Sequence, residues 1–383
     1  MANTLTAILP KILARGLMSL REQAIMTRLV NTDYSKDAAN KGDTINVPVP
    51  TAMTASAVTP ASTPPAIGGI TPTTTPIVLD QWQEASFHLT DKEMGEIDQN
   101  QSFLPMQVQE ALRAIVNAIN ADVHSKYKKI GGYVGTAGTT PFGSGVLTLS
   151  ATNARKVLNK QLCPLSSRRA VLNYDAEAAA LELAAFQDAD KAGGTGVKIE
   201  GQIGRKFGID WYTDDQVPTH TAGTITTGLI AKASTAVAVG ATSFVATTAA
   251  STGACALLAG DVIAIGSETY SLSANATQAS AATDVTLTLN NPIRTALVGS
   301  EAITVKATHV VNTVFHRDAY ALAMRSLAKS NVSPEFQSIL TDPQTGLSLR
   351  LEVKRGHKVD IWSFDALWGS ALVRPEMACR IAG

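Results

Sequence analysis

The sequence predicts an α+β fold from three observations. A long amphipathic helix is expected over 103–129, several segments alternate apolar and polar residues as strands do, and 223–305 is an Ala-, Thr-, Val- and Ser-rich stretch. The chain has 383 residues, 45% hydrophobic and 17% charged, so it can bury a substantial core. We therefore expect a globular protein of two or three domains.

The N-terminal segment predicts an amphipathic arm. Residues 4–30 carry apolar side chains at roughly helical spacing, and Pro10 should break or kink the helix near its start. No hairpin partner follows closely, so this arm could dock on its own body or on a neighbouring chain.

Two strands are expected next. Residues 41–50 alternate Ile and Val with Thr, Asn and Pro, and the prolines confine this strand to a sheet edge. Residues 76–90 predict a second strand with Ala85, Phe87 and Leu89 on one face. The intervening 51–75 is too long for a tight turn. We expect a long two-stranded arm that another chain supports, because an isolated ribbon is marginal in water.

The clearest helical pattern covers 103–129. Its apolar stripe recurs at steps of three and four residues: Leu104, Val108, Leu112, Ile115, Ile119 and Val123. The helix should stop at Lys126, Lys128 and Lys129, which Gly131-Gly132 follow. At ~1.5 Å per residue it would span about 40 Å, a length that suits a structural spine.

Mixed α/β material follows the spine. Ser150 is predicted to cap a helix that runs through Leu162, and 175–186 predict an Ala-rich helix. Strands are expected at 169–172 and 208–213.

Residues 223–305 predict a small all-β module inserted into another domain. Four short β-prone runs recur in it: 242–248, 261–265, 268–272 and 284–289. After this segment we expect a strand at 310–315, a helix at 318–328, a half-buried strand at 347–354 and another strand at 359–364, which a basic turn precedes.

A search for catalytic chemistry finds no candidate. The histidines stand apart, without an HExxH motif or a paired His/Asp spacing. His316-Arg317-Asp318 lacks the other parts of a kinase, so it predicts a strand-to-helix junction. The glycines of 131–145 lack the lysine of a phosphate loop and predict a flexible loop. Asp214-Asp215 predict a solvated turn. We therefore expect no catalytic, cofactor-binding or metal-binding residues, no cofactor and no enzyme activity.

Net charge and cysteine positions indicate which partners and which cell compartment to expect. The formal net charge is zero, so any contact with DNA should be local and weak. Cys163, Cys255 and Cys379 lie far apart and outside any CxxC motif, which favours reduced thiols in a cytoplasm. No apolar run is long enough for a membrane span, and no signal peptide is visible.

The order of these elements resembles that of the tailed-phage major capsid proteins, which share the Hong Kong 97-like fold. KGDTINVPVP resembles the rising strand of that family's extended loop, and Phe103–Lys129 resembles its spine helix. VVNTVFHRDAYALAM resembles the strand-then-helix of the axial domain, and WSFDALWGSALVRPEMACRI resembles the closing segment. The extra segment 223–305 resembles the β-barrel insert of short-tailed phage coat proteins, with 260–272 similar to part of that barrel.

The resemblance implies a division of the chain into seven parts. These are an arm helix at 1–35, an extended β-hairpin loop at 36–95, a spine helix and peripheral domain at 96–150, an axial domain at 151–222 and 306–345, an inserted all-β domain at 223–305, and a return to the peripheral domain at 346–383.

It also implies a function. The chain would be a structural coat protein that assembles into hexamers and pentamers of an icosahedral shell around packaged double-stranded DNA, with heterologous ring contacts. It would be made in the host cytoplasm and end in the virion capsid. Implied partners are a separate scaffolding protein, a portal protein, DNA through weak non-specific contact and, optionally, a decoration protein. The arm tip 51–75 contains no lysine, which argues against a lysine–asparagine cross-link.

Three other functions stay open at this point. A cellular nanocompartment shell of the encapsulin type would share the fold, although the insert argues against it. A β-rich tail or adhesion protein fits the Thr/Ala-rich segment but not the long helix. An enzyme with an unrecognised site is the last alternative.

Overall fold

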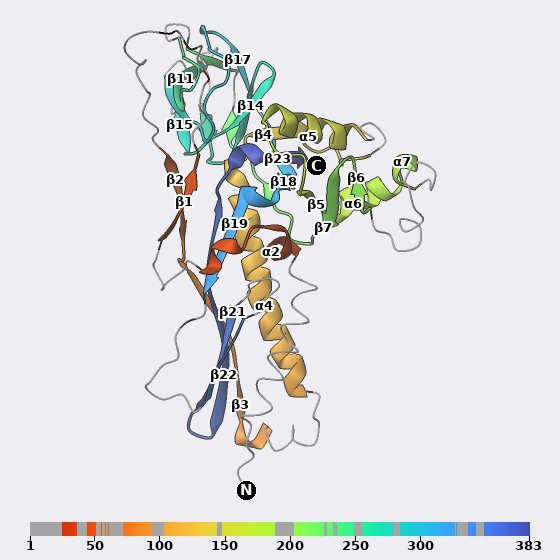
Figure 1. The fold of residues 1–383 in the computed structure, drawn as a ribbon, viewed down its shortest axis with the longest axis vertical. Helices are drawn as coiled ribbons and strands as arrows, with labels where there is room; N and C mark the ends of the chain where they lie inside the picture. Colours follow the sequence, from red (N-terminus) through yellow and green to blue (C-terminus); the bar gives the residue numbers. More distant parts are fainter. Residues whose placement is uncertain are drawn as a thin grey trace.

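A computed structural model shows an elongated molecule built along one long helix (Figure 1). The structure describes residues 25–36, 44–50, 55, 58, 60, 72–93, 103–143, 148–187, 203–225, 228–232, 236–248, 255–278, 284–325, 327, 336–341 and 348–383.

The spine is helix α4, Phe103–Ser125, continued by the 3-10 turn η3, Lys126–Lys129. The predicted stripe is its buried face, since five of the six stripe residues are described and each is at most 2% exposed: Val108, Leu112, Ile115, Ile119 and Val123. The helix ends where predicted, with Gly131 and Gly132 beyond it. Its 23 residues span about 35 Å.

A long antiparallel sheet packs on the spine. Its order is β19-β22-β21-β20, and β3 pairs with β22. The bounds are β3 Gln81–Thr90, β19 Tyr320–Arg325, β20 Phe336–Thr341, β21 Ser348–Arg355 and β22 Val359–Leu372. Strands β21 and β22 were predicted, although β22 is eight residues longer than expected because it continues past Phe364, first along β3 and then along β19.

The predicted helix at 318–328 is wrong. Strand β19 lies there, after a single 3-10 turn, η4, Arg317–Ala319. Tyr320, Leu322 and Met324 face the spine, while Ala321 and Ala323 face strands β1 and β2, so both faces of β19 are buried. A short run that is apolar on both faces has no strand-like alternation, and periodicity alone cannot distinguish it from a buried helix.

The predicted arm is present but is divided differently. Strand β1, Thr44–Val49, pairs only with β2, Thr73–Val78, in a two-stranded antiparallel sheet. The single strand predicted at 76–90 is wrong, because the chain changes sheets between Val78 and Gln81, where β3 begins. Ala85, Phe87 and Leu89 do share the more buried face of β3. Most of 51–71 lies outside the described residues.

The base of the arm is fixed to the body by apolar contacts. Ile45, Val47 and Ile77 of the two strands, together with Leu79, form one hydrophobic cluster with residues of β19 and β22. Gly369 in β22 allows this contact, because a Cβ there would lie 2.1 Å from the carbonyl oxygen of Val78.

A second sheet has the order β4-β23-β18-β5-β7-β6, and β8 pairs with one end of β18. The bounds are β4 Gly132–Gly135, β5 Arg168–Leu172, β6 Arg205–Lys206, β7 Ile209–Thr213, β8 Thr219–His220, β18 His309–His316 and β23 Ala378–Ala382, with the 3-10 turn η5 at Pro375–Met377. Strands β5, β7 and β18 confirm the predictions. The flexible loop predicted at 131–145 is wrong over Gly132–Gly135, because that stretch pairs in parallel with β23.

Three helices belong to this second sheet's part of the chain: α5 Leu149–Lys160, α6 Tyr174–Leu181 and α7 Ala184–Gln187. Ser150 does not cap α5, because the helix already begins after Thr148, whose carbonyl accepts the Thr152 amide. The single Ala-rich helix predicted at 175–186 is interrupted between Leu181 and Ala184 and forms α6 and α7.

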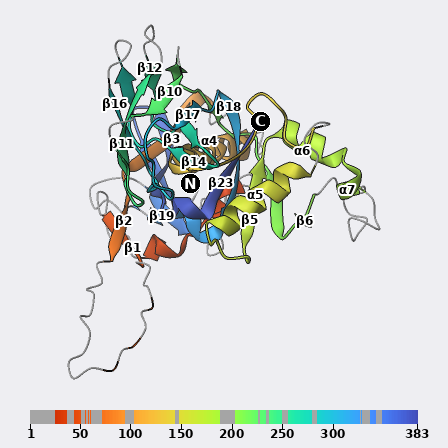
Figure 2. The same cartoon turned by 90° about the horizontal axis from the view of Figure 1, so that it is seen from above.

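Strands β9 to β17 form two sheets of their own. A six-stranded sheet has the order β14-β13-β17-β10-β11-β16, and a three-stranded sheet has the order β15-β12-β9. The bounds are β9 Thr224–Ile225, β10 Leu229–Ala231, β11 Ser243–Thr248, β12 Cys255–Leu257, β13 Val262–Ile265, β14 Glu268–Ser271, β15 Ala276–Gln278, β16 Val285–Thr288 and β17 Ala302–Val305. All four predicted β runs are strands, and a separate hydrophobic cluster lies between residues 229 and 305. These strands cap one end of the molecule (Figures 1 and 2).

Of the predicted arm helix at 4–30, only the end lies within the described residues. Helix α2, Ile25–Leu29, packs on the spine, and the 3-10 turn η2, Asp33–Lys36, contacts β19. The rest of that prediction, including Pro10, lies outside the described residues.

A buried polar junction as candidate functional site

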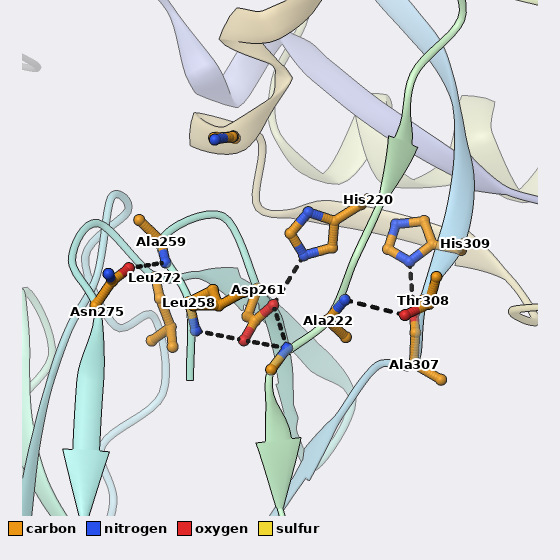
Figure 3. A network of polar contacts seen from close by, with 12 residues as sticks. His220, Ala222, Leu258, Ala259, Asp261, Leu272, Asn275, Ala307, Thr308 and His309 are labelled. Atoms are coloured by element: carbon orange, nitrogen blue, oxygen red, sulfur yellow. Dashed lines mark hydrogen bonds and ion pairs between the residues drawn. The ribbon is translucent and has the colours of Figure 1, made fainter. Parts of the chain in front are cut away.

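A group of buried polar side chains lies where the spine ends, between the second sheet and the all-β segment. We call it the polar junction and define it by Tyr127, His220, Asp261, His309 and Arg380. Tyr127 comes from η3, His220 from β8, His309 from β18 and Arg380 from β23, while Asp261 directly precedes β13. Residues far apart in the sequence therefore meet within one buried cluster, of which Figure 3 shows His220, Asp261 and His309.

Asp261 is completely buried and has a full set of donors. Its carboxylate accepts from the backbone amides of Leu258 at 2.7 Å and Gly223 at 3.1 Å, and it contacts Nε2 of His220 at 2.8 Å (Figure 3). The close approach of Gly223 requires glycine, because a Cβ there would lie 2.1 Å from the Ala256 carbonyl oxygen. A buried charge is tolerated when hydrogen bonds replace its hydration, and these contacts do so.

His220 also contacts Tyr127 at the end of the spine, so it links Asp261 to the spine. An ionised carboxylate can only accept, so Nε2 of His220 donates to Asp261 and leaves Nδ1 as an acceptor. The hydroxyl of Tyr127 lies 3.1 Å from Nδ1 and is the matching donor. Burial raises the pKa of Tyr127, which keeps this hydroxyl protonated. The chain Tyr127–His220–Asp261 therefore links η3, β8 and the start of β13 by directed hydrogen bonds.

His309 and Arg380 complete the junction. The ring of His309 lies 5.4 Å from that of His220, and its Nδ1 donates to the Ala307 carbonyl at 2.7 Å. Burial lowers the pKa of His309 to about 4, so the ring is neutral near pH 7. Arg380 is 0% exposed and lies over the Tyr127 ring, 5.0 Å from its centroid. Burial lowers the pKa of Arg380 to about 10, which still leaves it charged at neutral pH.

A second buried histidine–aspartate pair lies farther down the spine. Nε2 of His124 is 3.0 Å from a carboxylate oxygen of Asp214, and the same oxygen accepts from the Asn120 amide at 2.7 Å. Asn120 in turn accepts the Met26 backbone amide at 3.0 Å. This group joins α2, α4 and the segment after β7.

The environment of Asp214 corrects the prediction of a solvated Asp214-Asp215 turn. Asp214 is 4% exposed, whereas Asp215 is exposed. Burial acts to raise the pKa of Asp214, but hydrogen bonds from His124, Asn120 and the Gln216 amide outweigh it, so the pKa is lowered. Sequence reasoning missed both histidine–aspartate pairs because their members lie 90 and 41 positions apart.

The other residues singled out in the sequence, a spine lysine, the His-Arg-Asp motif and the cysteines, make contacts within the fold. Lys126 pairs with Asp122 at 2.9 Å, four residues earlier on the spine. His316 ends a strand and its Nδ1 accepts the Asp318 amide, so the His-Arg-Asp motif lies between two strands, not before a helix. Cys163 and Cys379 are free and buried, and burial raises the pKa of Cys379 to about 12. The side chain of Cys255 lies outside the described residues.

The contacts of the polar junction are suited to fixing the spine, the second sheet and the all-β segment to one another. Within the described part of the chain, no group of three or more His, Cys, Asp or Glu side chains could hold a metal ion, and no helix is long and apolar enough to cross a membrane. The polar groups of the junction are buried, and the hydrogen bonds between Tyr127, His220 and Asp261 and from Arg380 to Lys128 join separate elements.

Comparisons with known proteins agree with this architecture. Residues 71–245 match a family model described as phage capsid protein. A chain from Mycobacterium phage Che8 is similar in fold, with a TM-score of 0.53 and 15% identity over 94% of this chain and 91% of that chain. The chain is a structural phage coat protein with the Hong Kong 97-like capsid fold.

Two further solved structures are similar over most of their length. The capsid of cyanophage P-SCSP1u has a TM-score of 0.49 and 12% identity, covering 93% of this chain and 86% of that chain. A chain of a virus-like particle from Pyrococcus furiosus has a TM-score of 0.43 and 7% identity, covering 97% of this chain and 98% of that chain. No curated protein matches the coat protein.

Proposed function

We propose that this coat protein assembles into hexamers and pentamers that close into an icosahedral shell around packaged double-stranded DNA, and that it performs no catalysis. The observation that carries this proposal is the β1–β2 arm. One face of this two-stranded sheet, with Ile45, Val47 and Ile77, packs on the body, while most residues of its other face are exposed. A two-stranded sheet with one uncovered face is stabilised by a partner surface, and a neighbouring subunit would provide one.

The proposed division of labour follows the seven parts expected from the sequence. The spine and long sheet form the peripheral part, the second sheet with α5 to α7 forms the axial part, and 223–305 is an inserted module. Two features support the module: its strands pair only with one another in the two sheets, and it has a separate hydrophobic cluster.

We further propose that assembly takes place in the host cytoplasm with a separate scaffolding protein and a portal protein. DNA would be held by weak, non-specific contacts, as expected for a chain without net charge. A decoration protein is an optional addition to the finished shell. The alternative is a nanocompartment shell of the encapsulin type, which would enclose proteins instead of a genome.

Electron microscopy of the purified chain, expressed with and without neighbouring phage genes, tests the proposal. We expect closed shells or polyhedral fragments tens of nanometres across when a scaffolding protein is present. Small monomers or dimers under every condition would contradict assembly. The contents of shells made during infection separate the alternatives: nuclease-protected DNA supports a genome shell, and protein cargo without DNA supports a nanocompartment.

A further inference from the structure

Three adjacent strands of the second sheet place three polar side chains next to one another. Arg380 of β23 is directly opposite Tyr133 of β4 on one side and Thr313 of β18 on the other. Directly paired residues in a sheet project from the same face. Arg380 lies over the ring of Tyr127 in η3, so the end of the spine covers this face.

Each of these three side chains is buried and has polar atoms without a protein partner among the described residues. They are the Nε and Nη1 nitrogens of Arg380, the hydroxyl of Tyr133 and the hydroxyl of Thr313. The Tyr133 hydroxyl lies near the backbone of Ala137 but does not reach hydrogen-bond geometry. Among the described residues, the Arg380 guanidinium donates one hydrogen bond, from Nη2 to the Lys128 carbonyl at 3.1 Å.

The charges around this group are also unbalanced. Within the described chain no carboxylate lies within salt-bridge distance of Arg380, and the nearby Asp261 is already occupied by His220 and two backbone amides. Lys306 adds a second cation, with its Nζ 5.4 Å from the centroid of the Tyr133 ring. Buried charges are almost always paired, and an unpaired guanidinium flanked by hydroxyl donors is suited to an anion.

We propose that Arg380, Tyr133 and Thr313 bind one small monovalent inorganic anion of the halide type. The guanidinium would supply the charge and one of its unpartnered N–H donors, and the two hydroxyls would supply the remaining donors. A monovalent ion matches the single guanidinium charge, whereas a larger or divalent anion would bring more charge close to Asp261. This inference is independent of shell assembly, since it concerns the folded subunit alone.

Thermal unfolding of the unassembled full-length chain tests this site with chloride as the probe. Sodium chloride and sodium gluconate are compared at equal ionic strength, so that general screening is the same. A ligand that binds only the folded state raises the melting temperature. We expect wild-type protein to melt a few degrees higher in chloride, and we expect Thr313→Val and Tyr133→Phe to lose most of that difference.

Replacing the buried arginine itself, as in Arg380→Met, risks unfolding the protein. The test therefore uses the two hydroxyl variants and one exposed-arginine control. Thr313→Val and Tyr133→Phe each remove a single hydroxyl and nearly preserve shape. Arg113→Met removes an exposed arginine of the spine and should keep the full chloride effect. A chloride effect that is equal in all variants, or absent from wild type, overturns the proposal.

Crystals of the subunit grown in sodium bromide provide the direct measurement. An anomalous bromide peak within hydrogen-bond reach of the Arg380 guanidinium supports the site. A peak there with the density of water and no anomalous signal shows ordinary buried hydration and overturns it.

Discussion

Nε2 of His220 and Oδ1 of Asp261 lie 2.8 Å apart and connect the second sheet to the all-β segment. Both residues are at most 3% exposed, so the contact is shielded from solvent and salt. The pair has a defined direction, because the other histidine nitrogen accepts from Tyr127. Orientation of the proposed inserted module on the spine therefore depends on a hydrogen-bonded chain as well as on apolar packing.

Asp261→Asn should destabilise the protein strongly. The substitution keeps the shape but turns an acceptor of three hydrogen bonds into a group with one acceptor oxygen and an NH2 facing other donors. Leaving a buried donor without its acceptor costs about 1–3 kcal/mol per group. Urea unfolding of the unassembled chain measures the loss. Asp284→Asn is the matched control, because its pair with Lys232 is partly exposed and should contribute about 1 kcal/mol or less. Equal losses in both variants would contradict the role assigned to Asp261.

Asp214 should make stability depend on acid pH. Its pKa is lowered in the folded chain, so its contribution is complete above the unfolded pKa of about 4 and is lost as pH falls through the lower folded pKa. The free energy of unfolding of the wild type, measured by urea from pH 7 to pH 2.5, should therefore fall more steeply below pH 4 than that of Asp214→Asn. Asp215→Asn, next to it but exposed, should keep the wild-type slope.

The spine could be predicted from sequence because its information is local. Val108 to Val123 repeat at helical spacing, and the stop signal follows within a few residues. The polar junction could not, since nothing near His220 indicates that Asp261 lies opposite it. Strand β19 shows a third case: Tyr320–Arg325 has apolar residues on both faces because the spine covers one and the β1–β2 arm covers the other. Only tertiary packing distinguishes such a strand from a helix.

His309 should make stability depend on pH in a higher range. Burial lowers its pKa to about 4, whereas an unfolded histidine titrates near 6.5. Its stabilising contribution is therefore complete above about pH 6.5 and is lost progressively as pH falls toward 4, by about 3 kcal/mol in total. His309→Phe keeps a ring beside Tyr133 and should flatten this part of the urea-derived profile. His357→Phe removes an exposed histidine and should leave the profile unchanged. An equally flattened profile in that control would contradict the assignment of the pH dependence to His309.

Gly369→Ala should separate the arm from the body. The added methyl group would lie 2.1 Å from the Val78 carbonyl oxygen and 3.1 Å from the Leu79 Cα, and both are backbone atoms that cannot rotate away. Strand β2 must shift, which disturbs the cluster of Ile77 and Leu79 against β22 at a cost of about 1–3 kcal/mol. Hydrogen exchange should show loss of protection in β1 and β2 while α4 stays protected.

The same substitution connects the arm to assembly. If the β1–β2 arm must reach a neighbouring subunit, Gly369→Ala should strongly reduce the yield of closed shells even though the subunit itself stays folded. Gly228→Ala is the control, because no atom lies within 4 Å of the added methyl group. Electron microscopy and sedimentation of both variants, coexpressed with the scaffolding protein, give shell yields. Normal shells from Gly369→Ala, with exchange in the arm strands increased, would show that assembly does not need the arm held in this position.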